Sequence, residues 1–394
     1  MSDIVIERQG EWPDSLRLAR ARATPALGPR LLVFSGGSAL NDTSRRLKAY
    51  THNSAHLITP FDSGGSSQIL RTAFAMPAVG DLRSRLMALA EESDLGQPDT
   101  YRLFSHRLPR EGAPADLAAE VVALLAGRHP LLLALNAPMR PLIASYLDRF
   151  AAEVPADFDY RGASLGNLIL AGGYLDNNRA LDPVLFLMSK MAEVRGTVRP
   201  IADVNLEIGA ELADGRRVIG QRQVTGKEVA PLDSPISRLF LADGGRELPA
   251  TAVPLPEQNR RLIARSDLIL YPPGSLFSSV IANLLPAGVG RAVAARQVPK
   301  IYVPSLGQDP ECLGMDLCDQ IAALLAPLNR DLDQTEPPRR LISHVICDRQ
   351  VPARVAEAVE ARHGIPCHRL DLCAEGRADR YDPTALSELL ISLC

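Results

Sequence analysis

The chain has 394 residues, of which 46% are hydrophobic and 23% are charged, proportions that are ordinary for a globular protein and exclude extensive disorder. A formal net charge of −3 gives no general attraction for nucleic acid or for an anionic membrane, so any nucleotide should be bound as a small ligand in a pocket. Because a single core stops growing at roughly 250 to 300 residues, we expect one principal domain with additions.

The N-terminal residues give a first indication of location. The segment MSDIVIERQGEWPD has acids where a secretory signal has a basic region, and no apolar segment reaches the roughly 18 residues of a membrane span. We therefore expect a cytoplasmic protein with no membrane partner. Residues 1–29 have weak periodicity and are interpreted as an N-terminal extension, ahead of one α/β domain at residues 30–394.

The first elements of this domain follow the order strand, turn, helix, strand. The apolar run 31–34 predicts a buried strand, residues 35–38 a turn, residues 40–50 a helix and residues 56–59 a second strand. This order is typical of the start of a parallel doubly wound sheet. The predicted fold class is therefore α/β, with a Rossmann-like parallel sheet flanked by helices.

Two additions and further strands follow along the chain. Residues at about 72–160 predict a helical insertion, and residues at about 194–230, with turn signals at 213–215 and 225–227, predict a small antiparallel β element. Residues 267–271 and 300–303 are expected to be buried strands. The last segment, about 340–394, has the pattern strand, helix, strand, helix.

The cysteines are expected to remain thiols. All six lie in the last quarter of the chain, and none forms a CxxC pair. In a reducing compartment such residues act mainly as small buried hydrophobic groups. They are Cys312, Cys318, Cys347, Cys367, Cys373 and Cys394.

Four of the predicted strands end in loops rich in Gly, Ser and Pro: SGGSALN, FDSGGSS, PPGSLFSS and PSLGQD. In an open parallel sheet, ligands bind outside the carboxyl ends of the strands, and glycine allows backbone N–H groups to approach phosphate oxygens. Taken singly, each loop could be only a tight turn, and Asn283 could equally be a buried structural amide. The candidate nucleotide- or phosphate-binding residues are Gly36, Gly37, Ser38, Asn41, Gly64, Gly65, Ser66, Ser67, Pro273, Gly274, Ser275, Ser278 and Asn283.

A pair of acids accompanies these loops. Asp62 lies in the second loop and Asp81 opens the first helix of the insertion, so the two could share one Mg²⁺ ion together with phosphate oxygens. Alone, Asp62 could form an Asx-turn or a helix N-cap, and Asp81 could be an N-cap. Arg83, one turn into the same helix, could fork onto a phosphate or form a surface ion pair. Asp62, Asp81 and Arg83 are the catalytic candidates.

Other common chemistries have less support. The G-x-G-x-x-G dinucleotide pattern is absent, so no nicotinamide cofactor is expected and a nicotinamide oxidoreductase ranks last. His52, His56 and His106 have no acid or nucleophile at a telling spacing. Ser-His-Asp and Cys-His catalysis are therefore not supported.

Seven stretches, in this order, resemble one superfamily over roughly residues 31–393: SGGSALN, FDSGGSSQILR, PAVGDLRSRLMALA, SLGNLILAG, VRGTVRPIADVNLEIGAELADG, SDLILYPPGSLFSSVIANLLPAGV and YDPTALSELL. The chain is similar to the 2-phospho-L-lactate transferases (CofD) and the YvcK-type gluconeogenesis factors. The YvcK-type branch is the more similar, because its aspartate loop also continues GGSS and its helix opens G-D-x-R. The stretch SLGNLILAG adds Gly166 and Asn167 to the nucleotide-binding candidates.

The resemblance implies a Rossmann-like sheet that binds a nucleotide or a nucleotide sugar. The transferases move phospholactate from a guanylyl diphosphate donor to a deazaflavin alcohol, with Mg²⁺ held by aspartates. By that resemblance Asp62 and Asp81 match metal ligands, Gly36 and Gly37 the first turn, and Gly274-Ser275 the later phosphate loop.

Departures from the family pattern limit what can be carried over. Ser38-Ala39 replaces T-G, Ser63 replaces a second acid, Ser84 replaces the usual Asn, and Pro310-Glu311-Cys312 replaces G-E-T. Deazaflavin phospholactate transfer itself is therefore not predicted. We expect a Mg²⁺-dependent transferase acting on a nucleoside diphosphate-linked phosphoryl donor or, alternatively, a non-catalytic regulator that binds a nucleotide sugar. We also allow for a homodimer.

Overall fold

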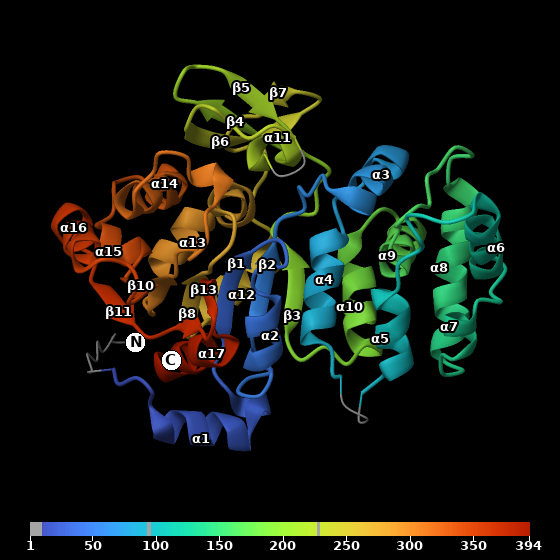
Figure 1. Ribbon diagram of the computed structural model, residues 1–394, viewed down its shortest axis with the longest axis horizontal. Helices are drawn as coiled ribbons and strands as arrows, with labels where there is room; N and C mark the ends of the chain where they lie inside the picture. The colour runs from blue at the N-terminus through green and yellow to red at the C-terminus, as the bar shows by residue number, and fades with distance from the viewer. Residues whose placement is uncertain (1–9, 93–95, 227–228) are drawn as a thin grey trace.

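The computed structural model describes residues 10–92, 96–226 and 229–394. Its centre is a seven-stranded sheet in which every neighbouring pair of strands is parallel (Figure 1). The predicted fold class is confirmed. From one edge to the other the strands are β11 (Cys367–Leu370), β10 (His344–Asp348), β9 (Lys300–Tyr302), β8 (Leu268–Tyr271), β1 (Leu31–Ser35), β2 (Ala55–Ile58) and β3 (Thr197–Pro200).

The central strand β1 is buried on both faces, as its unbroken apolar run predicts. Alternate residues face opposite ways: Leu32 and Phe34 belong to one hydrophobic core, and Leu31 and Val33 to another. The ring of Phe34 stacks on that of Tyr271 in the neighbouring strand β8, with 5.8 Å between the ring centroids. This packing fixes the ends of β1 and β8 beside each other.

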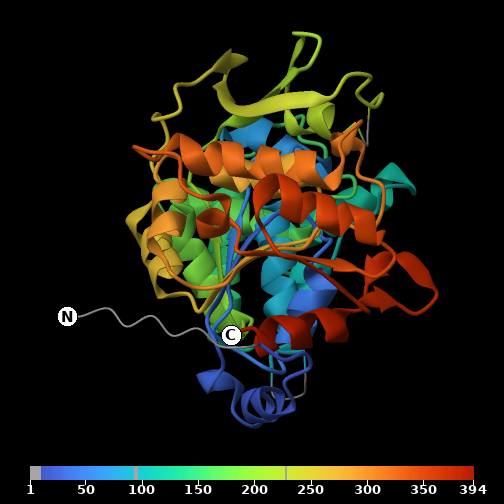
Figure 2. The ribbon, with the colours of Figure 1, turned by 90° about the vertical axis from the view of Figure 1, so that its left-hand side faces the viewer.

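Helices cover both faces of the sheet. One face carries α1 (Ser15–Ala23), α2 (Asn41–Leu47) and α17 (Pro383–Ser392). The first and last described helices lie together at one end of the molecule, where Asp14 N donates to Ser392 Oγ at 3.0 Å (Figure 2). The other face carries α12 (Glu257–Arg265), α13 (Val289–Ala295), α14 (Leu317–Arg330), α15 (Pro338–Leu341) and α16 (Ala353–His363).

A helical lobe with its own core lies beside β3 (Figure 1). That core also contains residues of the last two helices of the lobe, so the helical region continues past residue 160. The helices are α3 (Gly65–Phe74), α4 (Gly80–Leu89), α5 (Pro98–Ser105), α6 (Pro114–Leu125), α7 (Pro130–Leu133), α8 (Met139–Glu153), α9 (Leu165–Asp176) and α10 (Leu181–Met191).

Strand β3 forms one edge of the sheet. It has only four residues and ends at Pro200, which has no N–H to offer. Its Arg199 is bonded within the molecule, through Nε to Asn259 Oδ1 at 2.8 Å and through Nη2 to Asp182 Oδ2 at 2.6 Å.

The antiparallel element differs from its expected range. Residues 197–200 belong to the parallel sheet as β3, because they pair along β2, and the small sheet extends beyond residue 230. The turn expected at 213–215 is confirmed, whereas Lys227 of the second turn signal lies outside the described residues. The strand order is β5 (Arg217–Ile219), β4 (Glu207–Leu212), β6 (Ile236–Asp243) and β7 (Arg246–Glu247), and α11 (Gln221–Thr225) follows β5.

Three details near the sheet ends differ from a simple alternation of strands and helices. After β8 the chain forms a π-type turn, η2 (Leu276–Val280), and a 3₁₀ turn, η3 (Ile281–Leu284), in place of a regular α-helix. A further 3₁₀ turn, η4 (Pro310–Cys312), follows β9. Between β11 and α17 lies a hairpin of β12 (Cys373–Ala374) and β13 (Arg377–Tyr381) that the sequence did not predict, because it is short and largely exposed.

Two expectations about composition can be compared directly with the described residues. The six cysteines are thiols and not disulfides, as predicted; Cys318, Cys347 and Cys367 are buried. Within residues 10–92, 96–226 and 229–394, no helix combines the length and apolar character needed to cross a bilayer.

Candidate functional site

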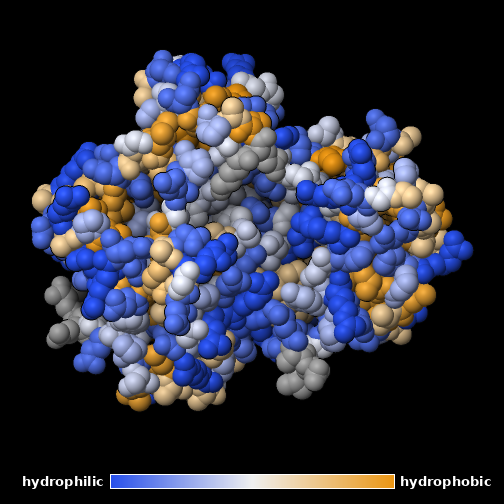
Figure 3. All heavy atoms as spheres, in the orientation of Figure 1, coloured by the Kyte–Doolittle hydropathy of each residue, from blue (hydrophilic) through white to orange (hydrophobic). Residues whose placement is uncertain are grey.

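The loops that follow β1, β2, β8 and β9 meet in one cavity of about 470 Å³. This is the convergence that the sequence predicted, at the carboxyl ends of neighbouring parallel strands. In Figure 3 the surface is hollowed below the small antiparallel sheet, and hydrophilic residues surround the hollow.

Half of the candidate residues line this cavity. They are Gly36, Gly37, Ser38, Asp62, Asp81, Pro273, Gly274, Ser275 and Ser278. The remaining candidates do not belong to its lining: Asn41, Gly64, Gly65, Ser66, Ser67, Arg83, Gly166, Asn167 and Asn283.

Two glycines let the first loop fold tightly over the ends of the neighbouring strands. A Cβ on Gly36 would lie 2.7 Å from Thr59 Oγ1, closer than a real Cβ contact allows. Gly37 has φ +60°, a left-handed conformation that favours glycine. The loop therefore presents the N–H of Gly37 toward α4, where it donates to Asp81 Oδ2 at 2.6 Å.

Both acids line the cavity near this point. Asp62 Oδ1 accepts from Gly64 N at 3.0 Å, which is the Asx-turn that its position allowed. Asp81 is not an N-cap: α4 begins at Gly80 after Val79, and the Asp81 carboxylate extends instead to the β1 loop. A Cβ on Gly80 would lie 3.2 Å from Asp62 Oδ2, so a glycine there lets α4 pack against the Asp62 loop.

Burial and the nearby charge of Asp62 raise the pKa of Asp81 to about 7. The Gly37 N–H and the charges of Arg85 and Arg83 act in the opposite direction but do not outweigh them. The cavity thus holds two carboxylates that do not readily carry two negative charges together. A cation between them would offset that repulsion.

A buried arginine supports the first loop from beneath. The Arg85 side chain is fully buried, its Nη1 donates to Ser44 Oγ, and its Nη2 donates to Gly37 O at 3.4 Å. Burial lowers the pKa of Arg85 to about 10, while the charge of Asp81 opposes that shift. Its charge therefore favours the ionised form of Asp81 from within the protein.

Arg83 follows neither of the two interpretations that its sequence position allowed. It is 9% exposed, so it is not a surface ion pair, and it does not line the cavity. Its Nε donates to Asn167 Oδ1 at 2.9 Å, and Asn167 Nδ2 donates to Ser66 Oγ at 3.1 Å. Gly166 makes room for this arrangement, because a Cβ there would lie 2.7 Å from Arg83 Cδ. These four candidates thus form one buried network that joins α3, α4 and α9.

Two further amide side chains outside the cavity hold the backbone and helices around it. Asn41 Nδ2 donates to Ser84 Oγ at 2.9 Å, which joins α2 to α4. Asn283 is fully buried, and its Nδ2 donates to Ser35 O at 2.9 Å and to Ser279 O at 2.8 Å. This contact corresponds to the structural interpretation of Asn283, and it ties the end of β1 to the turn after β8.

The loop after β8 was expected to present its backbone N–H groups to a phosphate, but several of these groups are bonded within the protein. Leu276 N donates to Asp309 Oδ2, and Phe277 N and Ser278 N both donate to Glu311 Oε2, each at 2.8 Å. Glu311 is 1% exposed. Internal carboxylates therefore already occupy three of the amide donors that an incoming phosphate was expected to use.

The antiparallel sheet contributes a cavity residue through α11, and sequence reasoning missed it. Gln221 Oε1 accepts from Ser63 N and from Ser63 Oγ, each at 3.3 Å. Since a backbone N–H can only donate, the oxygen of the amide must face Ser63. Nε2 is then the group left to meet a ligand, and it has no acceptor among the described residues.

The other missed lining residues come from the β1 and β2 loops, α2, η2, the β9 loop, the unpredicted hairpin and the start of α17. The β9 loop had been recognised by its composition, and the hairpin turn has one signal, Gly376 with φ +70°, that sequence reasoning did not use. These residues are Ala39, Asp42, Thr43, Thr59, Ser279, Ser305, Leu306, Gly307, Gln308, Asp309, Pro310, Asp379, Arg380, Tyr381 and Pro383.

The charge of the lining is strongly negative. Among the described residues its carboxylates are those of Asp42, Asp62, Asp81, Asp309 and Asp379, and its one cationic side chain is that of Arg380. Asp42 pairs with the exposed Arg45, and Asp379 pairs with Arg377. The carboxylates of Asp62, Asp81 and Asp309 are then the ones that would repel a bare polyanion placed beside them.

Comparisons with known proteins agree with this architecture. A gluconeogenesis factor of Bacillus subtilis is 29% identical over 297 residues, covering 75% of this chain and 74% of that protein. One from Halalkalibacterium halodurans is 28% identical over 301 residues, covering 75% and 72%. A Nostoc relative is 29% identical over 300 residues, and this chain spans only 52% of its length.

A solved structure supports the fold. The crystal structure of a Bacillus halodurans protein of the UPF0052 family superposes with a TM-score of 0.65 at 23% identity, covering 92% of this chain and 99% of that one. The family model described as 2-phospho-L-lactate transferase CofD matches residues 31–381. The chain therefore belongs to the CofD family and is a CofD-like protein similar to the YvcK-type gluconeogenesis factors.

Proposed function

We propose that the cavity binds a nucleoside diphosphate-linked ligand together with Mg²⁺. The observation that carries this proposal is the acid pair Asp62 and Asp81, half-buried beside the Gly37 amide in a cavity with four strand-end loops. The lining has five carboxylates and one arginine, so a diphosphate needs a cation to neutralise the charge between it and the protein.

The residues fit a hard divalent cation. Mg²⁺ is commonly held by one or two carboxylates together with phosphate oxygens and water. Asp62 and Asp81 would supply the carboxylates, and a pKa of about 7 for Asp81 means that a cation competes with a weakly held proton near neutral pH. When bound, the cation would withdraw charge from the phosphate oxygens of the ligand.

The remaining cavity residues suggest how the ligand is oriented. The amide Nε2 of Gln221 is a donor close to the Asp62 loop, and Arg380 of β13 is a cation for a phosphate or carboxylate at the hairpin side. Leu306, Tyr381 and Pro383 provide apolar surface on the same side. Arg83 is assigned no direct ligand contact; it positions α4 through Asn167.

In the transferase form of the proposal, an acceptor hydroxyl oxygen bonds to the phosphorus of the donor as the bond to the departing nucleoside monophosphate breaks. The hydroxyl proton passes to water or to a cavity carboxylate. Binding of both reactants in line within one cavity would supply part of the rate enhancement, and stabilisation of the developing charge would supply the rest.

A regulatory function is the second candidate, and a specific set of contacts favours it. Ser63 is bonded to α11 through Gln221 and through Arg222 N at 2.9 Å. Arg71 joins the same loop to the antiparallel sheet, since its Nη1 donates to Phe61 O and its Nη2 to Leu206 O. Ligand binding at Asp62 could therefore move the small sheet, which suits a protein related to gluconeogenesis factors.

Calorimetric titration separates these alternatives. Nucleoside diphosphates and nucleotide sugars are titrated into the full chain with Mg²⁺ and with EDTA, and the same is done for Asp62→Asn and Asp81→Asn. We expect binding that requires Mg²⁺ and is lost in both variants. Equal binding in EDTA and in the variants would refute the proposal. Binding followed by turnover with an added acceptor alcohol supports the transferase, and binding without turnover over a donor and acceptor panel supports the regulator.

A further inference from the structure

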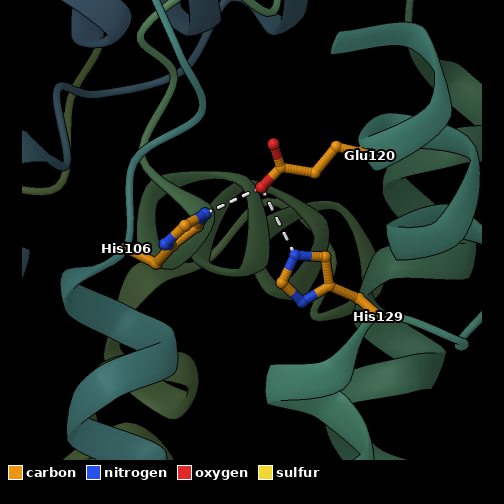
Figure 4. A group of neighbouring side chains, drawn as sticks. All are labelled: His106, Glu120 and His129. Atoms are coloured by element: carbon orange, nitrogen blue, oxygen red, sulfur yellow. Dashed lines mark hydrogen bonds and ion pairs between the residues drawn. The ribbon is translucent and has the colours of Figure 1, made fainter. Parts of the chain in front are cut away.

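A second cluster of metal-ligating side chains lies in the helical lobe. It consists of His106, which follows α5, Glu120 of α6, and His129, which precedes α7 (Figure 4). None of the three lines the cavity. No acid lies at a telling spacing from His106 in the sequence, but the fold brings Glu120 to it from 14 residues away.

The three side chains point toward one another. Nε2 of His106 lies 2.8 Å from Glu120 Oε1, and Nε2 of His129 lies 3.4 Å from the same oxygen (Figure 4). All three ligand atoms lie within 4.8 Å of one another. The His129 side chain is 8% exposed, whereas those of His106 and Glu120 are 34% and 24% exposed. The group is therefore buried on the His129 side and reached by solvent on the side of His106 and Glu120.

From this geometry we propose that His106, Glu120 and His129 bind a divalent transition metal of the zinc type. Two imidazole nitrogens and one carboxylate oxygen form the ligand set of open zinc sites, which leave a fourth position for water. With metal–ligand distances of about 2.0 to 2.2 Å, tetrahedral ligands lie roughly 3.4 Å apart. The His129–Glu120 separation of 3.4 Å already matches this value, whereas the His106–Glu120 separation of 2.8 Å is shorter and would have to widen on binding.

The nature of the ligands also selects the metal. Imidazole nitrogen favours zinc and similar ions, whereas Mg²⁺ prefers oxygen ligands. The cluster would therefore take a different ion from the acid pair of the cavity. Bound metal would join the end of α5, the middle of α6 and the start of α7, three helices that contribute residues to the core of the helical lobe.

One existing contact opposes the metal. Nδ1 of His129 accepts from Leu131 N at 3.2 Å, as the N-cap of α7. A neutral imidazole that binds metal through Nε2 carries its proton on Nδ1, so this hydrogen bond is lost when the metal binds. Loss of one cap lowers an equilibrium constant by roughly fivefold. Loss of an outer-shell partner lowers metal affinity roughly ten- to hundredfold, and loss of a direct ligand such as His129 lowers it more. The gain from coordination therefore exceeds the cost of losing the cap.

The test uses Zn²⁺ and Co²⁺ with the full chain. Glu120→Gln keeps an oxygen acceptor for both imidazoles but removes the charged ligand, and His106→Gln removes one nitrogen. We expect at least a tenfold loss of Zn²⁺ affinity in each variant, with the melting temperature in EDTA unchanged in Glu120→Gln. His368→Gln, an exposed histidine far along the chain, is the matched control and should keep the wild-type affinity.

Co²⁺ absorption separates this site from the thiols, because Cys347 and Cys367 have sulfur atoms 3.9 Å apart and could also bind metal. The part of the Co²⁺ spectrum that disappears in Glu120→Gln should contain no sulfur-to-metal charge-transfer band, because the proposed site has no thiol ligand. Hydrogen exchange in a peptide covering residues 129–134 should speed up on Zn²⁺ addition, because the Leu131 cap is released. Wild-type Zn²⁺ affinity in both variants, or exchange at 129–134 that is unchanged or slower, would overturn the three-ligand site.

Discussion

Removing one cavity carboxylate should stabilise the metal-free protein at alkaline pH. Burial and the charge of Asp62 raise the pKa of Asp81 from 3.8 to about 7. Between these values the unfolded chain has lost the Asp81 proton while the native protein still holds it, so the free energy of unfolding falls as pH rises. Asp81→Asn keeps an oxygen that can accept from Gly37 N but has no proton to lose.

The size of the effect follows from the shift. One pKa unit corresponds to roughly 1.4 kcal/mol, and integration from pH 5 to pH 8 gives a relative gain of roughly 3 kcal/mol for Asp81→Asn over the wild type. Urea denaturation in EDTA at several pH values measures it. Asp62→Asn should flatten the wild-type slope in part, since it removes the second-largest cause of the shift.

Two further observations decide whether the reasoning holds. Excess Mg²⁺ should restore the stability of the wild type at pH 8 but leave Asp81→Asn unchanged, because the variant lacks a proposed ligand. Wild-type and Asp81→Asn stabilities that run parallel from pH 5 to pH 8 in EDTA would refute the assignment of a raised pKa to Asp81.

Three other substitutions test separate parts of the structure. Glu311→Gln should destabilise the fold by about 1 to 3 kcal/mol in urea denaturation, because the amides of Phe277 and Ser278 lose their charged acceptor; a neutral result would mean that solvent replaces it. Gly166→Ala should cost about 1 to 3 kcal/mol, since the new Cβ would lie 2.7 Å from Phe104 O as well as from Arg83 Cδ; wild-type stability would contradict that packing. Gln221→Leu should weaken Mg²⁺-dependent nucleotide binding about fivefold in calorimetry, and unchanged affinity would remove Gln221 from the ligand site.

The sequence predicted the parts of the site that depend on strand ends. Apolar runs located β1, β2, β8 and β9, and the Gly- and Ser-rich segments after them marked the loops that meet in the cavity. This succeeded because a parallel sheet places every carboxyl end at one edge, so local composition determines a three-dimensional neighbourhood.

Partners set by side-chain geometry could not be predicted in this way. Nothing in the spacing indicates that Glu311 receives the amides after β8, or that Arg83 turns from the cavity to Asn167. The β13 hairpin brings Arg380 to the cavity although its strands lack apolar alternation. Such contacts depend on long-range packing, which a periodicity of 2 or 3.6 residues does not encode.

The construction of β3 has a consequence for how copies of this chain could associate. An exposed sheet edge is the usual place for strands of separate molecules to zip together. Three features make the β3 edge a poor template for such pairing. The strand is short, it ends at a proline, and the side chain of Arg199 is bonded within the molecule. Pairing of copies of this chain through β3, and the growth of fibrous aggregates from this edge, are therefore discouraged.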